Sequence, residues 1–360
     1  MNLSKTMKSI TFTVIIGTLS LSGPANSMGG PIVGVERKAF TVEQRDTLKK
    51  IKGLHYLRSN ETELDLFEPH IKNLGFGYVG VGADQNYTMA AMAQPSHVWL
   101  MDYDPWVMRL HLIYRVIFLK APTAKAFVAL WWNRDNLHAQ LRKHYGGDHN
   151  RLARLLWIYK KYRRFLRPYL NWALKRKRLG TGTTWLSNPV YYQRVRTMWQ
   201  EGRFQPLPGD LHGTQVLQGI AAAAKRLRIA IRIVYLSNAE MYLPYTKQFI
   251  ANMKALPWDS NTLLVRTVRG KSYVQKSDKW HYNIQPFGAD FLRRLGQGHY
   301  NNVHTMMQDF DNTPRLIRRR VQRPRGFSRF TRAVVDRETL LARMKKHREE
   351  KKRSRRRRKR

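Results

Sequence analysis

The feature that most constrains this chain is a strand, a glycine turn, a helix and a second strand within residues 78–104. The letters YVGVG are followed by ADQNYTMAAMA and then by VWLMDYD. A buried strand that runs into a glycine turn and a helix, with a second strand ending on acids, opens many nucleotide-binding α/β domains. Glycine lets the chain turn sharply and lets a ligand approach backbone N–H groups. The unit therefore predicts a parallel sheet with a ligand site beside the turn.

The predicted site begins with Gly80 and Gly82 at the end of the first strand. Asp102 lies twenty residues beyond Gly82, at the end of the second strand, where a carboxylate can accept hydrogen bonds from both ribose hydroxyls. Two structural alternatives remain open: a tight turn without a ligand, and Asp102 as the N-cap of the next helix. Asp104 precedes Pro105 and suits that cap better, which leaves Asp102 for the ligand.

The rest of the chain alternates in the same way, which predicts an α/β fold with a mostly parallel sheet and helices on both faces. We expect strands at 78–81, 98–101, 204–207, 229–236, 262–268 and 281–285. We expect helices at 42–57, 61–74, 86–93, 105–119, 123–141, 150–178, 214–227 and 289–295. Another helix is expected after residue 240, ending at about residue 256. The predicted organisation is a helical lead-in over 28–76, a domain over 77–314 with a basic helical insertion at about 123–200, and a largely disordered basic tail over 315–360.

The N-terminus has the pattern of a signal peptide. Lys5 and Lys8 precede an apolar run at residues 10–21, and Ala25-Asn26-Ser27 is typical of a cleavage site. We expect residues 1–27 to be removed and the protein to be exported, to the periplasm or the medium of a bacterium. The alternatives are an uncleaved anchor and a misassigned start codon, and without a signal the protein would be cytoplasmic. The absence of cysteine excludes disulfides and thiolate zinc sites.

The charge of the chain is strongly positive. The formal net charge is +42, and residues 315–360 hold 22 Lys/Arg against 4 Asp/Glu. Such a field attracts polyanions such as nucleic acid, anionic lipid or acidic glycan, and the tail is the densest part of it. A generally alkaline, solvated surface is the alternative. No stretch after the leader is apolar enough to span a membrane, and the sequence does not indicate an oligomeric state.

The segments GYVGVGADQNY and VWLMDYDPWVM resemble motifs I and II of class I S-adenosylmethionine-dependent methyltransferases, which have a Rossmann-like fold. The resemblance implies that Gly80 and Gly82 receive the methionine part of the cofactor and that Asp102 binds the ribose. More loosely, Asp210 in GDLHG resembles the acid on the adenine side. The chain is also similar to exported bacterial methyltransferase-like proteins.

The sequence departs from the family pattern at two positions. Tyr78 stands where the family usually has an acid, and Gln85 stands at the third glycine. We expect Asp84 and Asn86 to supply the missing polar contacts to S-adenosylmethionine. Since the cofactor is made inside cells, export of the protein would favour a fold that has lost its chemistry.

Methyl transfer depends mainly on alignment, so it requires no particular catalytic residue. As substrate-positioning groups we expect Asn238 and Glu240, in YLSNAE, with Tyr235 and His212 behind them. A loop cap and a helix N-terminal charge are the structural alternatives for Asn238 and Glu240. The spacing of the histidines matches no metal site, and we expect no metal.

Two functions follow, an enzyme and a binding module. The first is a methyltransferase-like protein that binds S-adenosylmethionine or a related adenosine ligand, with an unknown substrate. The second is an inactive Rossmann-like module that binds nucleic acid, anionic lipid or glycan through its basic surface and tail. The aromatic and basic residues of 157–178 favour the second, because rings beside cations suit nucleic acid. The alternative is that these rings face the core of the insertion.

Overall fold

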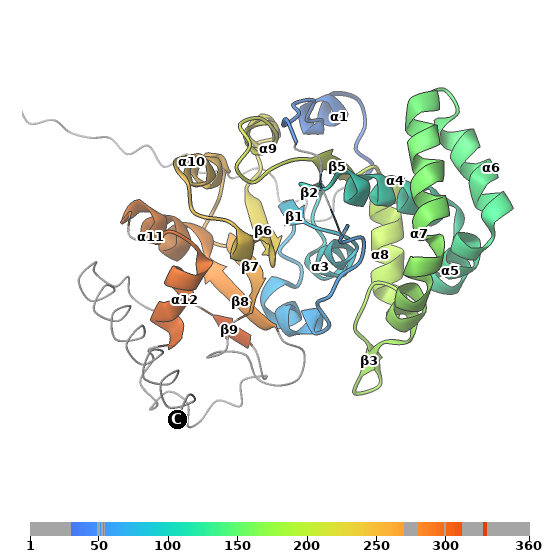
Figure 1. Cartoon of the computed structure of the whole chain (residues 1–360). Coiled ribbons are helices and arrows are strands. Elements are labelled where there is room, and N and C mark those ends of the chain that lie inside the picture. The colour runs from blue at the N-terminus through green and yellow to red at the C-terminus, as the bar shows by residue number, and fades with distance from the viewer. Residues whose placement is uncertain are drawn as a thin grey trace, which may run out of the picture.

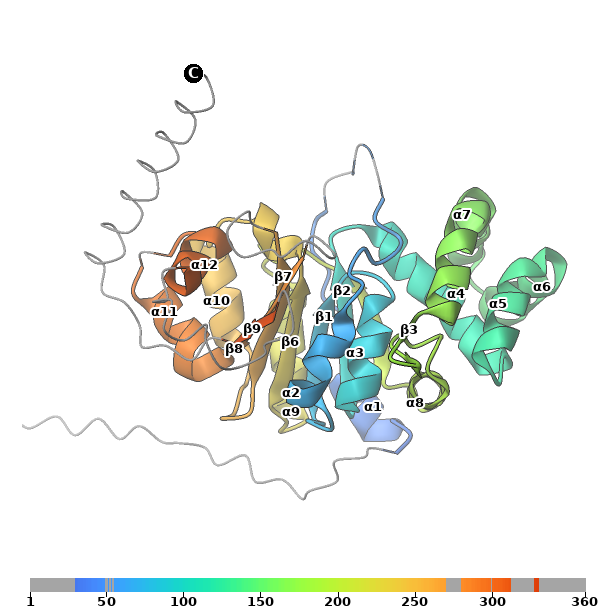
Figure 2. The same cartoon turned by 90° about the horizontal axis from the view of Figure 1, so that it is seen from below.

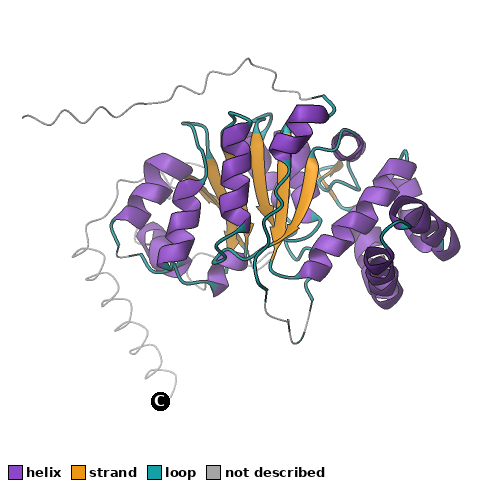
Figure 3. Ribbon diagram, turned by 90° about the horizontal axis from the view of Figure 1, so that it is seen from above, coloured by secondary structure: helices purple, strands orange, loops and turns teal. Residues whose placement is uncertain are grey.

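The computed structural model describes residues 30–48, 51, 53, 55–269, 280–298, 300–311 and 327–329. The predicted signal peptide, residues 1–27, lies outside the described residues, as does most of the predicted tail. The fold is a Rossmann-like α/β fold, as the sequence predicts. Helices cover both faces of one central sheet (Figure 3).

The central sheet has the strand order β5-β2-β1-β6-β7-β8-β9. Its strands are β1 (Gly77–Val81), β2 (His97–Asp102), β5 (Phe204–Pro208), β6 (Ile231–Ser237), β7 (Leu263–Val268), β8 (His281–Pro286) and β9 (Phe327–Arg329). The first five neighbours, from β5 to β7, are parallel, whereas β8 is antiparallel to β7 and β9 is parallel to β8. The chain first adds strands on one side of β1 and then crosses to the other, so the order reverses between β1 and β6. That reversal is where open α/β sheets bind ligands.

Alternate residues of the strands enter two separate hydrophobic cores. Tyr78 and Leu100 face one core, whereas Val79 and Trp99 face the other. A strand that is buried on both faces needs a nearly continuous run of apolar residues, which is why the predicted strands at β1, β2, β6 and β7 coincide with those observed.

The helices lie on both faces of the sheet and also extend beyond it on one side (Figure 1). They are α1 (Gly34–Phe40), α2 (Glu68–Ile71), α3 (Gln85–Ala93), α4 (Pro105–Lys120), α5 (Ala124–Trp132), α6 (Arg134–Tyr145), α7 (His149–Lys175), α8 (Pro189–Gln200), α9 (Val216–Arg226), α10 (Lys247–Ala255), α11 (Arg293–Gly296) and α12 (Val303–Asp311). Single turns occur at Leu64–Phe67, Ala239–Tyr242 and Phe287–Leu292. Buried side chains of α3, α4, α7 and α8 share one core, and those of α9, α10 and α12 share the other.

The predicted insertion consists of α5, α6, α7 and α8, with a two-residue hairpin of β3 (Lys177–Arg178) and β4 (Thr181–Gly182). The single helix predicted at 123–141 is in fact two, because Asn133 leaves the helical conformation and its side chain caps α6 by accepting from the Asn136 N–H at 3.1 Å. Thr123 caps α5, since its side chain accepts from the Ala126 N–H at 3.1 Å. Helix α8 was not predicted as a separate helix, although Asn188-Pro189 is an N-cap followed by proline at the first helical position.

The helix predicted at 42–57 is wrong, because none of residues 42–48 or 55–57 is helical. This stretch makes long-range contacts instead. The Val42 N–H donates to the Gln205 side chain at 3.0 Å, and the Asp46 carboxylate accepts from the Gln215 N–H at 2.9 Å, just before α9. The chain thus runs along the β5 side of the sheet towards the carboxyl ends of the strands.

The last strand falls within the predicted tail. β9 pairs in parallel with β8, which would otherwise leave the backbone groups of its outer edge unpaired. These three residues are therefore ordered by the sheet, although the sequence predicts a largely disordered segment from residue 315. None of the described helices is both long and apolar enough to cross a membrane.

Candidate functional site

The candidate site lies at the carboxyl ends of β1, β2, β5 and β6. These four strands are parallel, so their ends meet at one edge of the sheet. The parallel topology therefore places four of the predicted residues on this edge: Gly82 after β1, Asp102 at the end of β2, Asp210 after β5 and Asn238 after β6. We call the edge of the sheet where these four strands end the carboxyl edge. Figure 2 shows the sheet from below.

The turn after β1 requires both of its glycines. Gly82 has a φ of 101°, a region that side chains with a Cβ rarely adopt, and a Cβ there would overlap the Gln85 amide. A Cβ on Gly80 would overlap the side chains of Asn86 and Tyr78. The space above Gly80 is thus filled by the protein itself, whereas Gly82 sets the direction of the chain.

The backbone of Gly82 is fixed on both sides. Its N–H donates to the Met101 carbonyl at 3.0 Å, and its carbonyl lies 3.1 Å from Nε2 of His111. Burial lowers the pKa of His111 to about 4, so the ring is neutral at pH 7. Nε2 then donates to Gly82, and Nδ1 accepts from the Tyr87 hydroxyl at 2.6 Å. This histidine holds the turn in place, a role that the sequence analysis missed.

Asn86 is fully buried, and all of its polar capacity serves the turn. Its amide donates to the carbonyls of Val81 and Ala83 at 3.1 and 3.0 Å, and its Oδ1 accepts from the Tyr78 hydroxyl at 2.7 Å. The tyrosine that stands in place of the family's acid is therefore the partner of Asn86. Together they brace the turn from inside.

Asp84 also points into the protein, with an exposed fraction of only 1%. Its carboxylate accepts from the Tyr169 hydroxyl at 2.9 Å and from the Trp185 indole at 2.8 Å. Burial raises the pKa of Asp84, while these hydrogen bonds oppose the rise by stabilising the charged form. Asp84 thereby ties the turn to the helical insertion, and in this arrangement its oxygens face the insertion.

Asp102 differs from these residues because it is only half-buried. Its Oδ1 accepts from the Asp104 N–H at 2.7 Å. Burial raises its pKa to about 7, and the neighbouring Asp104 carboxylate adds to the rise. Asp104 has the capping role that the sequence predicts, since it accepts from the Trp106 N–H at 2.9 Å. The second oxygen of Asp102 is therefore the acceptor that the carboxyl edge can offer to a ligand.

Gln85 marks the reversal point between β1 and β6. Its exposed fraction is 6%, and its amide nitrogen lies 3.5 Å from the Ser237 hydroxyl at the end of β6. Its Oε1 is buried without a hydrogen-bond partner among the described residues. Buried polar atoms are usually paired, so this oxygen is a second position where a donor from a ligand or water would be stabilised.

Asp210 and His212 form the loop between β5 and α9. The Asp210 carboxylate accepts from the His212 N–H at 2.8 Å, which closes a local turn. The Asp210 N–H donates to Asp46 at 3.0 Å. His212 Nε2 lies 2.9 Å from the Pro244 carbonyl, so the ring bridges this loop to the segment before α10. Asp46 was not predicted, because only the fold brings it to this loop.

Glu240 is sealed inside the protein. Both it and Arg266 have fully buried side chains, and the guanidinium of Arg266 binds both carboxylate oxygens at 2.8 and 2.9 Å. The Tyr245 hydroxyl also donates to Glu240. With its oxygens satisfied in this way, the carboxylate has no face toward the carboxyl edge. Asn238 is half-buried and donates to the Asn60 side chain at 3.3 Å.

Residues 55–63, called the strap, cross the carboxyl edge. At one end, the His55 ring stacks on Trp106 with centroids 3.6 Å apart, and its Nδ1 lies 2.5 Å from Asp104. At the other end, the N–H groups of Thr62 and Glu63 donate to the Tyr282 hydroxyl on β8 at 3.1 and 2.9 Å. The strap therefore spans from α4 to β8.

Glu61 is the buried centre of the strap, with an exposed fraction of 4%. Its carboxylate accepts from the hydroxyls of Tyr235, Ser237 and Thr267, which lie on β6 and β7. The carboxylate also raises the pKa of Tyr235, after burial as the larger cause. Tyr235 thus faces the strap, and the ends of β6 and β7 are covered by the protein's own acid. Glu61 was not predicted as a site residue, since nothing in its local sequence pattern indicates burial.

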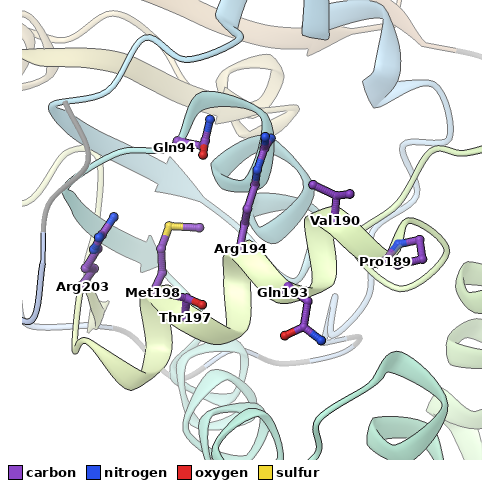
Figure 4. Close-up of a pocket in the computed structure, with 8 residues that line it drawn as sticks. All are labelled: Gln94, Pro189, Val190, Gln193, Arg194, Thr197, Met198 and Arg203. Carbon is purple, nitrogen blue, oxygen red and sulfur yellow. The ribbon is translucent and has the colours of Figure 1, made fainter.

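A pocket of about 500 Å³ lies elsewhere, at the opposite edge of the sheet (Figure 4). It is lined mostly by α8 and by Gln94, which follows α3, and Arg203, which precedes β5. Ligands of open α/β sheets bind at the carboxyl ends of strands, so this pocket does not belong to the candidate site.

The fold and the carboxyl edge define a Rossmann-like α/β domain with a half-buried acid at the end of its second strand. The chain belongs to the family described as a domain of unknown function, DUF7790, whose model matches residues 56–331. The match begins at the second residue of the strap and ends just after β9, so the family's domain includes β9 and most of the strap. No curated protein matches the chain.

Proposed function

We propose that the carboxyl edge at β1 and β2 binds an adenosine-bearing ligand, S-adenosylmethionine or a relative, as in a methyltransferase-like enzyme. The observation that carries the proposal is Asp102, a half-buried carboxyl at the end of β2 with an oxygen left for a ligand. Two vicinal ribose hydroxyls are the donors that such a carboxylate accepts at this position of a nucleotide-binding sheet.

Other residues have supporting roles in this proposal. Gly82 directs the turn beside the ligand, and His111 holds it. Gln85, whose Oε1 has no hydrogen-bond partner among the described residues, would turn this oxygen toward the cofactor's ammonium group, and Asp210 would lie on the adenine side. Asn238, at the end of β6, lies on the substrate side of the edge. Since the sulfonium is already activated, these residues would act by aligning the methyl group and the nucleophile.

A second candidate is a catalytically inactive module of the same fold that binds polyanions. The strap favours it, because Glu61 occupies the hydroxyl groups at the ends of β6 and β7. An enzyme would need access to this half of the carboxyl edge for its substrate, whereas a catalytically inactive module would not. The two candidates make opposite predictions about the cofactor.

The deciding experiment is thermal unfolding of the full chain with S-adenosylmethionine or S-adenosylhomocysteine. A ligand that binds only the native state stabilises it by about 2.7 kcal/mol at 100 times its Kd. We expect a rise in Tm with the wild type and none with Asp102→Ala. Asp135→Ala, which removes a carboxylate that is 83% exposed, is the matched control and should keep the shift. No shift of the wild type with either compound overturns the proposal and leaves the second candidate.

The pH dependence of binding tests the role of Asp102 separately. The pKa of Asp102 is raised to about 7, so the carboxylate that accepts the ribose hydroxyls is largely protonated at pH 6 and ionised at pH 8. Affinity should rise about tenfold between these pH values. Asp102→Asn should bind weakly, with no such rise. An affinity that is independent of pH in the wild type would contradict this role.

A further inference from the structure

One face of α7 exposes aromatic and basic side chains together. Its opposite face packs into the core through residues such as Leu155, Ile158 and Leu166. The exposed residues that share the other face form the α7 stripe: Arg154, Trp157, Lys161, Arg164, Phe165, Pro168, Trp172 and Lys175. They recur at intervals of three and four residues, which is the spacing of neighbours along one side of a helix.

Three large rings of the stripe are open to solvent. Trp157 is 48% exposed, Phe165 is 41% exposed and Trp172 is 37% exposed. From the sequence, such rings could also face the core of the insertion. The ring of Tyr169 does, but these three do not. Several large rings exposed on one helix face indicate a surface that meets a partner.

Cations lie between the first two rings of the stripe and at both of its ends. At 1.5 Å per residue, the three rings are about 12 and 10 Å apart along the axis. Lys161 and Arg164 lie in the first interval, and Arg154 and Lys175 lie at the ends. The whole helix carries eight Lys/Arg and no Asp or Glu. A strand of alternating planar bases and phosphates has the complementary arrangement.

The stripe adjoins the candidate site. α7 packs against α4 (Figure 2), and Trp157 meets Trp106 in the first turn of α4 with ring centroids 4.7 Å apart. The Lys161 ammonium lies 4.7 Å from the Trp106 ring and 4.8 Å from the Trp157 ring. Trp106 is four residues beyond Asp102, so the stripe begins beside the end of β2.

The strap extends the same chemistry towards the carboxyl edge. The Arg58 guanidinium lies 4.9 Å from the Phe165 ring, and the His55 ring lies 6.4 Å from Tyr162. A chain that lies along the stripe would therefore meet the strap and the end of β2 next.

We propose that the α7 stripe binds single-stranded nucleic acid, with bases on its rings and phosphates at its cations. Single-stranded nucleic acid would then be the substrate class of the proposed site, and this part of the proposal rests on the proposed function. Binding of nucleic acid to the stripe itself needs no cofactor. Stacking on aromatic rings requires unpaired bases, which excludes the interior of a duplex. A membrane-surface helix separates an apolar face from a charged face, whereas this stripe interleaves them.

The test is the affinity of the full chain for a labelled single-stranded oligonucleotide of about twelve nucleotides, followed by fluorescence anisotropy without cofactor. The double substitution Trp157→Ala and Trp172→Ala should weaken binding at least tenfold, because each stacked base contributes substantially to affinity. The matched control is Trp258→Ala, which removes a ring that is 44% exposed on another part of the protein. Its affinity should be unchanged, and thermal unfolding checks that both variants are folded.

Three further measurements separate the alternatives. A duplex of the same sequence should bind more weakly than the single strand. If the single strand and the duplex bind with equal affinity, and the double substitution changes neither affinity, the proposal is overturned and binding is due to charge alone. Vesicles with anionic lipid should bind equally well with and without the two rings, and a loss confined to vesicles would assign the stripe to membranes instead. The double-substituted variant should keep the Tm shift that S-adenosylmethionine gives the wild type, so failure of the cofactor proposal is distinguishable from failure of this one.

Discussion

Two acids that follow parallel strands of the same sheet have opposite environments. Asp102, at the end of β2, is half-buried, and burial raises its pKa to about 7. Glu240, just after β6, is fully buried, and Arg266 binds both of its oxygens. The sequence presents both as acids beside a strand end, and both were expected in the site.

The difference shows that position on a sheet does not by itself make an acid a site residue. Glu240 satisfies a structural requirement, because its carboxylate is the negative charge that pairs with the fully buried guanidinium of Arg266 on β7. Asp102 faces an edge where the described protein offers it a backbone N–H and a repelling neighbour. An acid that the fold leaves incompletely paired is the better candidate for a ligand.

The largest expected effect comes from breaking the buried ion pair between Arg266 and Glu240. Arg266→Met should lower the free energy of unfolding by about 3–5 kcal/mol, because it leaves the Glu240 carboxylate buried without its cation. Urea unfolding measures the loss. Arg134→Met removes the cation of an exposed pair with Asp135 and should cost less than about 0.5 kcal/mol. An equal loss of free energy of unfolding in both variants would show that the Arg266–Glu240 pair is not shielded from water.

A smaller effect of opposite sign is expected at Asp102. Its pKa is about 7 in the folded state and about 3.9 in an unfolded chain, so the folded state binds a proton more tightly between these values. The contribution of Asp102 to stability is therefore greatest below about pH 4 and is lost as pH rises to 7. Asp102→Asn should be more stable than the wild type by roughly 2–4 kcal/mol at pH 8.

The advantage of Asp102→Asn should shrink as the pH falls and should disappear near pH 4. Urea unfolding of both proteins at pH 4.5 and pH 8 tests this. A difference that is the same at both pH values would mean that Asp102 titrates like a solvated carboxyl. The contrast with Glu240 would then be lost.

The smallest effect is expected at the turn that separates the two regions. Gly82→Ala should cost about 1–2 kcal/mol, because the residue has a positive φ and its Cβ would meet the Gln85 amide. Gly147→Ala is the matched control, since a Cβ there meets nothing within 4 Å. Thermal unfolding of both variants measures the difference. A negligible cost at Gly82 would show that the turn can relax.

Strands β1, β2, β6 and β7 were predictable because they are buried, largely apolar runs that the two cores require. The lead-in was not, because the hydrogen bonds of Val42 and Asp46 are made to residues more than 160 positions away. A local pattern that suits a helix does not reveal partners of this kind. The break at Asn133 was missed for a different reason, since the cap competes with a helix that local propensity would continue.

The candidate site was predictable in position but not in pairing. Asp102 and Asp104 could be assigned separate roles from the proline that follows them, and the capping role of Asp104 is confirmed. Nothing in the sequence links Glu240 to Arg266 or Glu61 to Tyr235. Whether a polar residue is free for a ligand depends on contacts across the fold, which only the structure provides.

The strap has a practical consequence for any shortened version of the protein. A fragment beginning at β1 would lack Glu61, and the hydroxyls of Tyr235, Ser237 and Thr267 would lose their shared acceptor. The Tyr282 hydroxyl would lose two backbone donors as well. Such a fragment would expose the ends of β6 and β7 to water and to other chains. Removing the residues that precede β1 should therefore yield a polypeptide that is prone to aggregation.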